Sequence, residues 1–125
     1  MYPFLYIGIG ATLGAWLRFW LGLKMNGLFP VIPIGTLAAN LIGGFLMGIF
    51  MAITKDHVLF SPAIRMAVAT GFLGGLTTFS TFSAETVYLV SHQQYFWTAL
   101  IIISHVAGTI FATILGIYTM KYFTV

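Results

Sequence analysis

The chain has 125 residues, of which 60% are hydrophobic and 6% are charged, and its formal net charge is +3. A soluble domain carries about 25% charged residues, so this composition excludes a soluble enzyme and a nucleic-acid-binding protein. The absence of cysteine excludes disulfides and thiolate metal sites. The composition is typical of an integral membrane protein that contacts lipid.

Four apolar runs follow one another along the chain. A membrane-spanning helix needs roughly 20 apolar residues, and each run is long enough. We expect spans over residues 4–23, 34–54, 61–91 and 95–120, which together make a single four-helix transmembrane domain covering residues 1–125. No run shows the alternation of apolar and polar residues that is typical of strands, so the predicted fold class is all-α.

The third run is too long for one uninterrupted span, and its middle combines glycines with hydroxyl residues. Gly74 and Gly75 are followed closely by Thr77 and Thr78. Glycine disfavours a helix interior, so we predict that the third helix is broken over residues 74–78. Unwound backbone at membrane depth persists only where its carbonyls are buried in protein or bind an ion, and such oxygens suit a hard cation.

Basic residues are divided almost evenly between the two sides of the predicted bundle. Lys55, Arg65 and Lys121 belong to one side, and Arg18 and Lys24 to the other. Because cytoplasmic loops normally carry an excess of Lys and Arg, this chain has little preference for either orientation. Two copies can then pair antiparallel as a dual-topology homodimer. The alternative is one fixed orientation that is set by the hydrophobicity of the individual spans.

Polar side chains inside the spans are the best guide to function, because they are costly in lipid. In the second span, Thr36 and Asn40 are four residues apart and share a face. In the fourth span, His105, Thr109 and Thr113 form a polar stripe at the same spacing. The ordinary explanation of both groups is hydrogen bonding between neighbouring helices. The functional one is a set of donors along an ion pathway.

In the third span, two aromatic residues are three positions apart and point the same way. Phe79 and Phe82 are accompanied by the hydroxyls of Ser80 and Thr81, and Glu85 follows. Aromatic rings have positive edges, so two rings presented edge-on can favour an anion without a full positive charge. The alternative is that both rings are simply packed in the core or against lipid.

Three segments of the chain resemble one family. They are the run from Gly74 to Ser83 followed by Glu85, residues 35–40 (GTLAAN) and residues 13–18 (LGAWLR). Together they resemble the CrcB/Fluc fluoride channels, and the resemblance covers essentially the whole chain in order. It implies a multi-pass protein of the bacterial inner membrane that is no enzyme. Such a channel exports fluoride passively, lowers cytoplasmic fluoride and thereby gives fluoride resistance.

The resemblance also implies an architecture and a set of site residues. Members are antiparallel homodimers with two pores at the subunit interface and a structural sodium ion, not transported, on the two-fold axis. Main-chain carbonyls of Gly74 and Thr77 from both copies would bind this sodium. Arg18 would lie near a pore mouth, and Glu85 would be a vestibule acid. The residues expected along the fluoride pore are Asn40, Phe79, Phe82, Ser80, Thr81, Thr36, His105 and Thr109.

Two other classes of membrane protein remain as alternatives. A small proton-coupled multidrug exporter also has four spans, but it needs a membrane-embedded carboxylate, typically in the first span, and this first span has none. A non-conducting assembly subunit would use its polar faces only for structure. In that case, removal of Asn40 or Phe82 would destabilise the dimer without any transport phenotype.

Overall fold

The computed structural model describes residues 2–55 and 60–124, and all regular structure in these ranges is helical. This agrees with the predicted all-α fold class. In chain order, the elements are α1 (Tyr2–Met25), a short 3-10 turn (Asn26–Leu28), α2 (Ile34–Lys55), α3 (Pro62–Arg65), a π-helical segment (Met66–Leu73), α4 (Gly74–Leu76), α5 (Phe79–Ser91) and α6 (Tyr95–Phe123).

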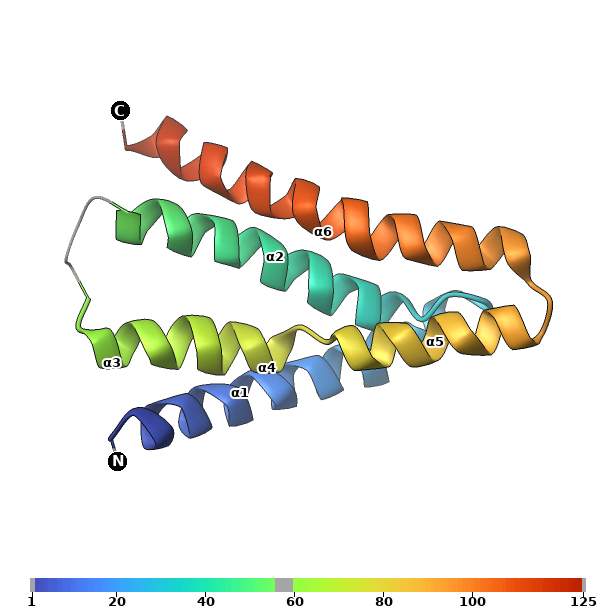
Figure 1. Cartoon of the computed structure of the whole chain (residues 1–125), viewed down its shortest axis with the longest axis horizontal. Coiled ribbons are helices and arrows are strands. Elements are labelled where there is room, and N and C mark those ends of the chain that lie inside the picture. Colours follow the sequence, from blue (N-terminus) through green and yellow to red (C-terminus); the bar gives the residue numbers. More distant parts are fainter. Residues whose placement is uncertain (1, 56–59, 125) are drawn as a thin grey trace.

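The helices lie side by side along one direction. Figure 1 shows that α1, α2, the series from α3 to α5, and α6 run back and forth, so that both termini lie at the same end. α2 packs mainly along α6, whereas α1 packs along the π-helical segment and α4. In the described part of the chain, three helices are long and apolar enough to cross a membrane: Tyr2–Leu28, Ile34–Lys55 and Tyr95–Phe123.

The helical backbone of the third segment stops at Leu76 and resumes at Phe79. Thr77 has φ −84° and ψ 154°, and Thr78 has φ −149° and ψ 118°, so both residues are extended. The side chain of Thr78 accepts a hydrogen bond from the Thr81 N–H and thereby caps the start of α5. The sequence therefore stops one helix after two glycines and starts the next with a capping threonine.

Close helix packing depends on glycines, most clearly where α1 meets the third segment. A Cβ added at Gly14 would overlap the carbonyl oxygen of Phe72 and would come within 2.7 Å of the Leu76 nitrogen. Because these neighbours are backbone atoms, they cannot move aside without shifting a helix. Gly14 thus lets the two helix backbones approach closely in the apolar interior.

We expect Gly14→Ala to lower the free energy of unfolding by about 2 kcal/mol, which is within the usual cost of overpacking. Gly8 offers a matched control on the same helix, because nothing lies within 4 Å of a Cβ built there. Gly8→Ala should leave stability unchanged or raise it slightly, since alanine is the better helix former. Thermal unfolding in detergent measures both variants, and equal midpoints for the two would contradict the packing argument.

Candidate functional site

Asn40 on α2 binds the non-helical backbone between α4 and α5. Its Oδ1 accepts a hydrogen bond from the Thr78 N–H at 2.7 Å, and its Nδ2 donates to the Thr78 carbonyl at 3.0 Å. In an uninterrupted helix, the Thr78 N–H would donate to the carbonyl of Gly74. Asn40 therefore replaces a helical hydrogen bond and holds the interruption in a fixed position.

Asn40 also contacts His105 on α6, which in turn contacts the aromatic pair of α5, Phe79 and Phe82. Its Nδ2 lies 2.9 Å from Nδ1 of His105. The imidazole of His105 stacks on the ring of Phe82 with centroids 4.6 Å apart, and Phe82 meets Phe79 edge-on at 5.4 Å. Four residues from three different helices thus form one contiguous group.

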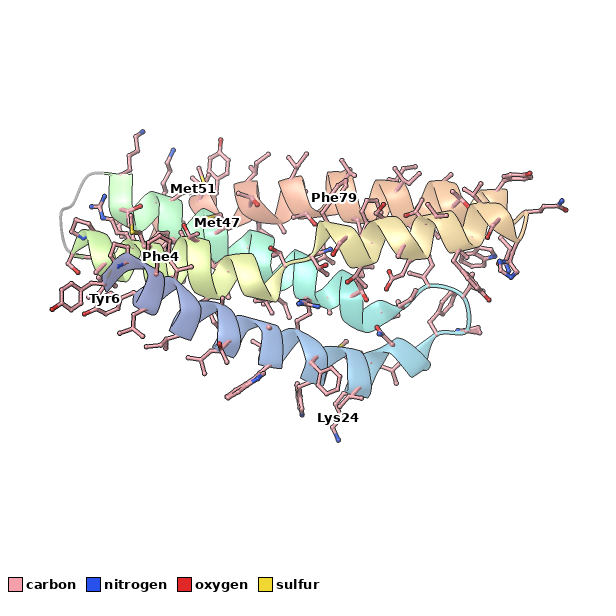
Figure 2. The ribbon with its side chains drawn as sticks, turned by 60° about the horizontal axis from the view of Figure 1, so that its bottom comes forward. Phe4, Tyr6, Lys24, Met47, Met51 and Phe79 are labelled. Carbon is pink, nitrogen blue, oxygen red and sulfur yellow. The ribbon has the colours of Figure 1, made fainter. Side chains whose placement is uncertain are left out.

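Phe79 and Phe82 have very different exposures. Phe82 is 6% exposed, whereas Phe79 is 75% exposed. Figure 2 shows Phe79 at the start of α5, on the opposite side of the molecule from Lys24 near the end of α1. The two rings therefore connect the interior of the chain with its surface.

A cavity of about 310 Å³ lies beside this group and is called the first cavity here. The residues that line it are Asn40, Thr77, Thr78, Phe79, Phe82, His105, Val106, Thr109 and Ile110. Five of the eight residues expected along the pore are among them. The cavity offers an amide, hydroxyls, an imidazole and two aromatic rings, which is a set of donors without a fixed charge.

A second cavity of about 270 Å³ contains two further expected hydroxyls, those of Thr36 and Thr81. It is lined by Arg18, Phe19, Gly22, Leu23, Asn26, Thr36, Thr78 and Thr81. Thr36 and Thr81 therefore lie apart from Asn40 and His105. Glu85 is joined to this group because the Thr36 hydroxyl donates to its Oε1 at 2.7 Å.

Thr78 lines both cavities, although it is not among the site residues predicted from the sequence. Its Oγ1 donates to Oγ1 of Thr81 at 2.9 Å and lies 3.3 Å from Oγ of Ser80. These contacts place Ser80 next to the site even though it lines neither cavity. A threonine directly before an apolar run indicates a helix cap, and this was visible in the sequence. The hydrogen bonds of Thr78 to Asn40 could not be predicted, because the two residues are 38 positions apart in the sequence.

Arg18 binds the same interruption from α1. Its Nε donates to the carbonyl of Gly75 at 3.0 Å, and its side chain lines the second cavity. In an uninterrupted helix this carbonyl would accept from the N–H of Phe79. Arg18 therefore has a structural contact in addition to the position expected for it near a pore mouth.

Comparison with known proteins identifies the family. The family described as "CrcB-like protein, Camphor Resistance (CrcB)" matches residues 5–117. Proteins named "Fluoride-specific ion channel FluC" are similar over nearly their whole length. The one from Nitrosospira multiformis is 54% identical over 98% of this chain and 95% of its own. The one from Thiobacillus denitrificans is 48% identical over 98% of both chains.

A third relative of the same name, from Nitrosomonas europaea, is 50% identical over 97% of this chain and 95% of its own. These names describe ion channels, in agreement with the expectation that the chain is not an enzyme. The resemblance found in the sequence is confirmed: the chain belongs to the CrcB family, and FluC fluoride channels are its relatives.

Proposed function

We propose that this chain forms a channel that passes fluoride passively across the bacterial inner membrane and so lowers cytoplasmic fluoride. The observation that carries the proposal is the first cavity, where Phe79, Phe82, Asn40 and His105 come together beside non-helical backbone. The relatives named as fluoride-specific channels support the choice of ion.

The chemistry of the first cavity suits a small, strongly hydrated anion. Fluoride must exchange its water for other donors, and these must release it again for conduction to be fast. Ring edges, hydroxyls and an amide provide donors of modest strength. None of the described residues that line this cavity is Lys or Arg, and a fixed cation there would slow the release of the ion.

The segment from α3 to α5 would be the third of four membrane crossings, broken at Thr77 and Thr78. Irregular backbone at membrane depth is tolerated where protein groups satisfy it or where it borders a polar cavity. Here the side chain of Asn40 satisfies Thr78, and Thr77 and Thr78 both border the first cavity. A multi-pass protein with both termini on one side would result.

The functional unit would be an antiparallel, dual-topology homodimer with two pores at the subunit interface. The exposure of Phe79, at 75%, supports this arrangement, because a ring that lines a pore needs a wall opposite it. In the homodimer, each copy would supply the opposite wall for the first cavity of the other copy. The weak charge asymmetry of the sequence permits the opposite orientations that this pairing requires.

A structural sodium ion, not transported, would bind where the two interruptions meet on the two-fold axis. The carbonyls of Gly74 and Thr77 fit this role, since both lose their helical donors. The Thr78 N–H donates to Asn40 instead of Gly74, and the Thr81 N–H donates to Thr78 Oγ1 instead of Thr77. Two copies would supply four such oxygens, which are ligands that a hard cation prefers.

Replacing sodium exhaustively with N-methylglucamine should reduce fluoride flux by about tenfold or more, since uncompensated carbonyls facing each other cost several kcal/mol. Thr77→Val should have a smaller effect, because the carbonyl is retained and only the hydroxyl bond to the Leu73 carbonyl is lost. Flux that is unchanged without sodium, while sodium analysis shows none bound, would contradict a structural ion.

Fluoride efflux from liposomes that contain the purified protein tests the proposed function. A fluoride electrode should record rapid efflux, and a chloride electrode should record almost none under the same gradient. A well-folded dimer that releases no fluoride would overturn the proposal and favour the non-conducting assembly subunit. Transport of organic cations driven by a proton gradient would favour the multidrug exporter.

A further inference from the structure

The orientation of the Asn40 side-chain amide is fixed by two independent contacts. The Thr78 N–H can only donate, so the atom 2.7 Å from it is the amide oxygen. The Thr78 carbonyl can only accept, so the atom 3.0 Å from it is the amide nitrogen. The hydrogen-bond network thus assigns which end of the amide faces α6.

This orientation determines the tautomer of His105. The amide nitrogen of Asn40 lies 2.9 Å from His105 Nδ1 and has protons but no acceptor lone pair. His105 Nδ1 must therefore accept, and it carries no proton. In a neutral imidazole the proton then resides on Nε2. A second proton on Nδ1 would place two donors face to face.

The remaining nitrogen of the ring, Nε2, has a proton to donate. His105 is 4% exposed, and its Nε2 is buried without a hydrogen-bond partner among the described residues. A buried donor without an acceptor is costly, so such a group is normally paired or used. The stacked ring of Phe82 covers one face of the imidazole and restricts its rotation.

We propose that Asn40 holds His105 as the Nε2–H tautomer and that this N–H is a hydrogen-bond donor for the anion that passes Phe82. The inference rests on the proposed function, because His105 is one of the residues that line the first cavity. The proton stays on the ring throughout, and only a hydrogen bond forms and breaks. A neutral donor beside an aromatic ring binds a dehydrated anion more weakly than a cation does, which favours its release.

Nitrogen NMR of the intact dimer with 15N-labelled histidine tests the tautomer directly. The chain has three histidines, and the His105 signals are those missing from the His105→Gln variant. We expect a pyridine-type Nδ1 and a pyrrole-type, protonated Nε2. A protonated Nδ1 in the wild-type protein would overturn the assignment. This measurement does not depend on any transport activity.

Asn40→Asp tests whether Asn40 sets the tautomer. A carboxylate can only accept hydrogen bonds. The ring nitrogen that faces it, Nδ1, should therefore carry the proton and become the pyrrole-type nitrogen. If Nδ1 remains unprotonated in this variant, Asn40 does not control the ring. The wild-type spectrum alone still decides the tautomer if the variant does not fold.

A pair of substitutions at His105 tests the donor by flux. The amide of glutamine reaches the position of Nε2, whereas that of asparagine reaches only the position of Nδ1. Fluoride flux through His105→Gln should exceed that through His105→Asn by about tenfold, which corresponds to one hydrogen bond to a charged group. Ser104→Ala is the control, because the Ser104 hydroxyl donates to the Leu100 carbonyl of its own helix.

The two proposals fail in different ways. No flux through the wild-type protein would overturn the channel, while the tautomer could still be read from the spectrum. Rapid wild-type flux together with equal flux through both His105 variants would overturn the donor role and leave the channel intact. A Ser104→Ala variant that loses as much flux as His105→Asn would also count against a specific role for His105.

Discussion

Replacing Phe82 with isoleucine should reduce fluoride flux by roughly 100-fold while the protein still dimerises. The substitution removes the ring edge that meets Phe79 and the face that stacks on His105. Aromatic contacts contribute about 0.5–1.5 kcal/mol each beyond burial. The loss of two contacts, and of the ring edge that is proposed to face the anion, would raise the barrier by an amount of this size. Isoleucine retains most of the apolar volume, so the fold should survive.

The measurement is liposome efflux combined with size-exclusion chromatography of the same preparation. Phe4→Ile is the matched control, since Phe4 is 82% exposed at the start of α1. The control should transport like the wild-type protein. Wild-type flux through Phe82→Ile would contradict the role of the ring. A dimer that falls apart in this variant would instead favour a purely structural role.

Asn40→Ala should have the second largest effect, on both flux and stability. It removes the partners of the Thr78 N–H, the Thr78 carbonyl and His105 Nδ1 together. Buried groups that lose their partners cost about 1–3 kcal/mol each. We therefore expect destabilisation by at least about 2 kcal/mol and flux reduced by roughly 30-fold or more.

Thr119→Val provides the comparison for Asn40→Ala, because the half-buried Thr119 side chain donates its hydroxyl to the Leu115 carbonyl of its own helix, α6. It should change neither thermal stability nor fluoride efflux. If Asn40→Ala lowers stability and leaves the flux of the surviving dimers intact, the bonds of Asn40 are structural only. If both variants behave like the wild-type protein, the role assigned to Asn40 is wrong.

Three of the four predicted spans agree closely with α1, α2 and α6, because a long apolar run in a membrane protein has few alternatives to a helix. The third segment was harder to predict. Its hydropathy indicates a crossing, and its glycines point to the region where the helix stops. The π-helical turns of Met66–Leu73 depend on packing against α1, and no local pattern specifies them.

Several of the residues named from the sequence lie together in the structure, but their arrangement could not be predicted. Spacing along a helix correctly placed Phe79 beside Phe82, since both belong to α5. It could not show that His105 stacks on Phe82, because the two residues lie on different helices. Nor could it predict which hydroxyls line which of the two cavities, because that depends on how the other helices pack around α5.

Thr78 lines both cavities, and its hydroxyl has a single proton to donate. While this proton is directed to Thr81, it is unavailable to an ion beside Asn40. In the proposed channel, a rotation of this one hydroxyl would decide whether its proton is donated to Thr81 or to an ion in the first cavity. The timescale of such a change would be that of a hydroxyl rotor rather than of a moving helix.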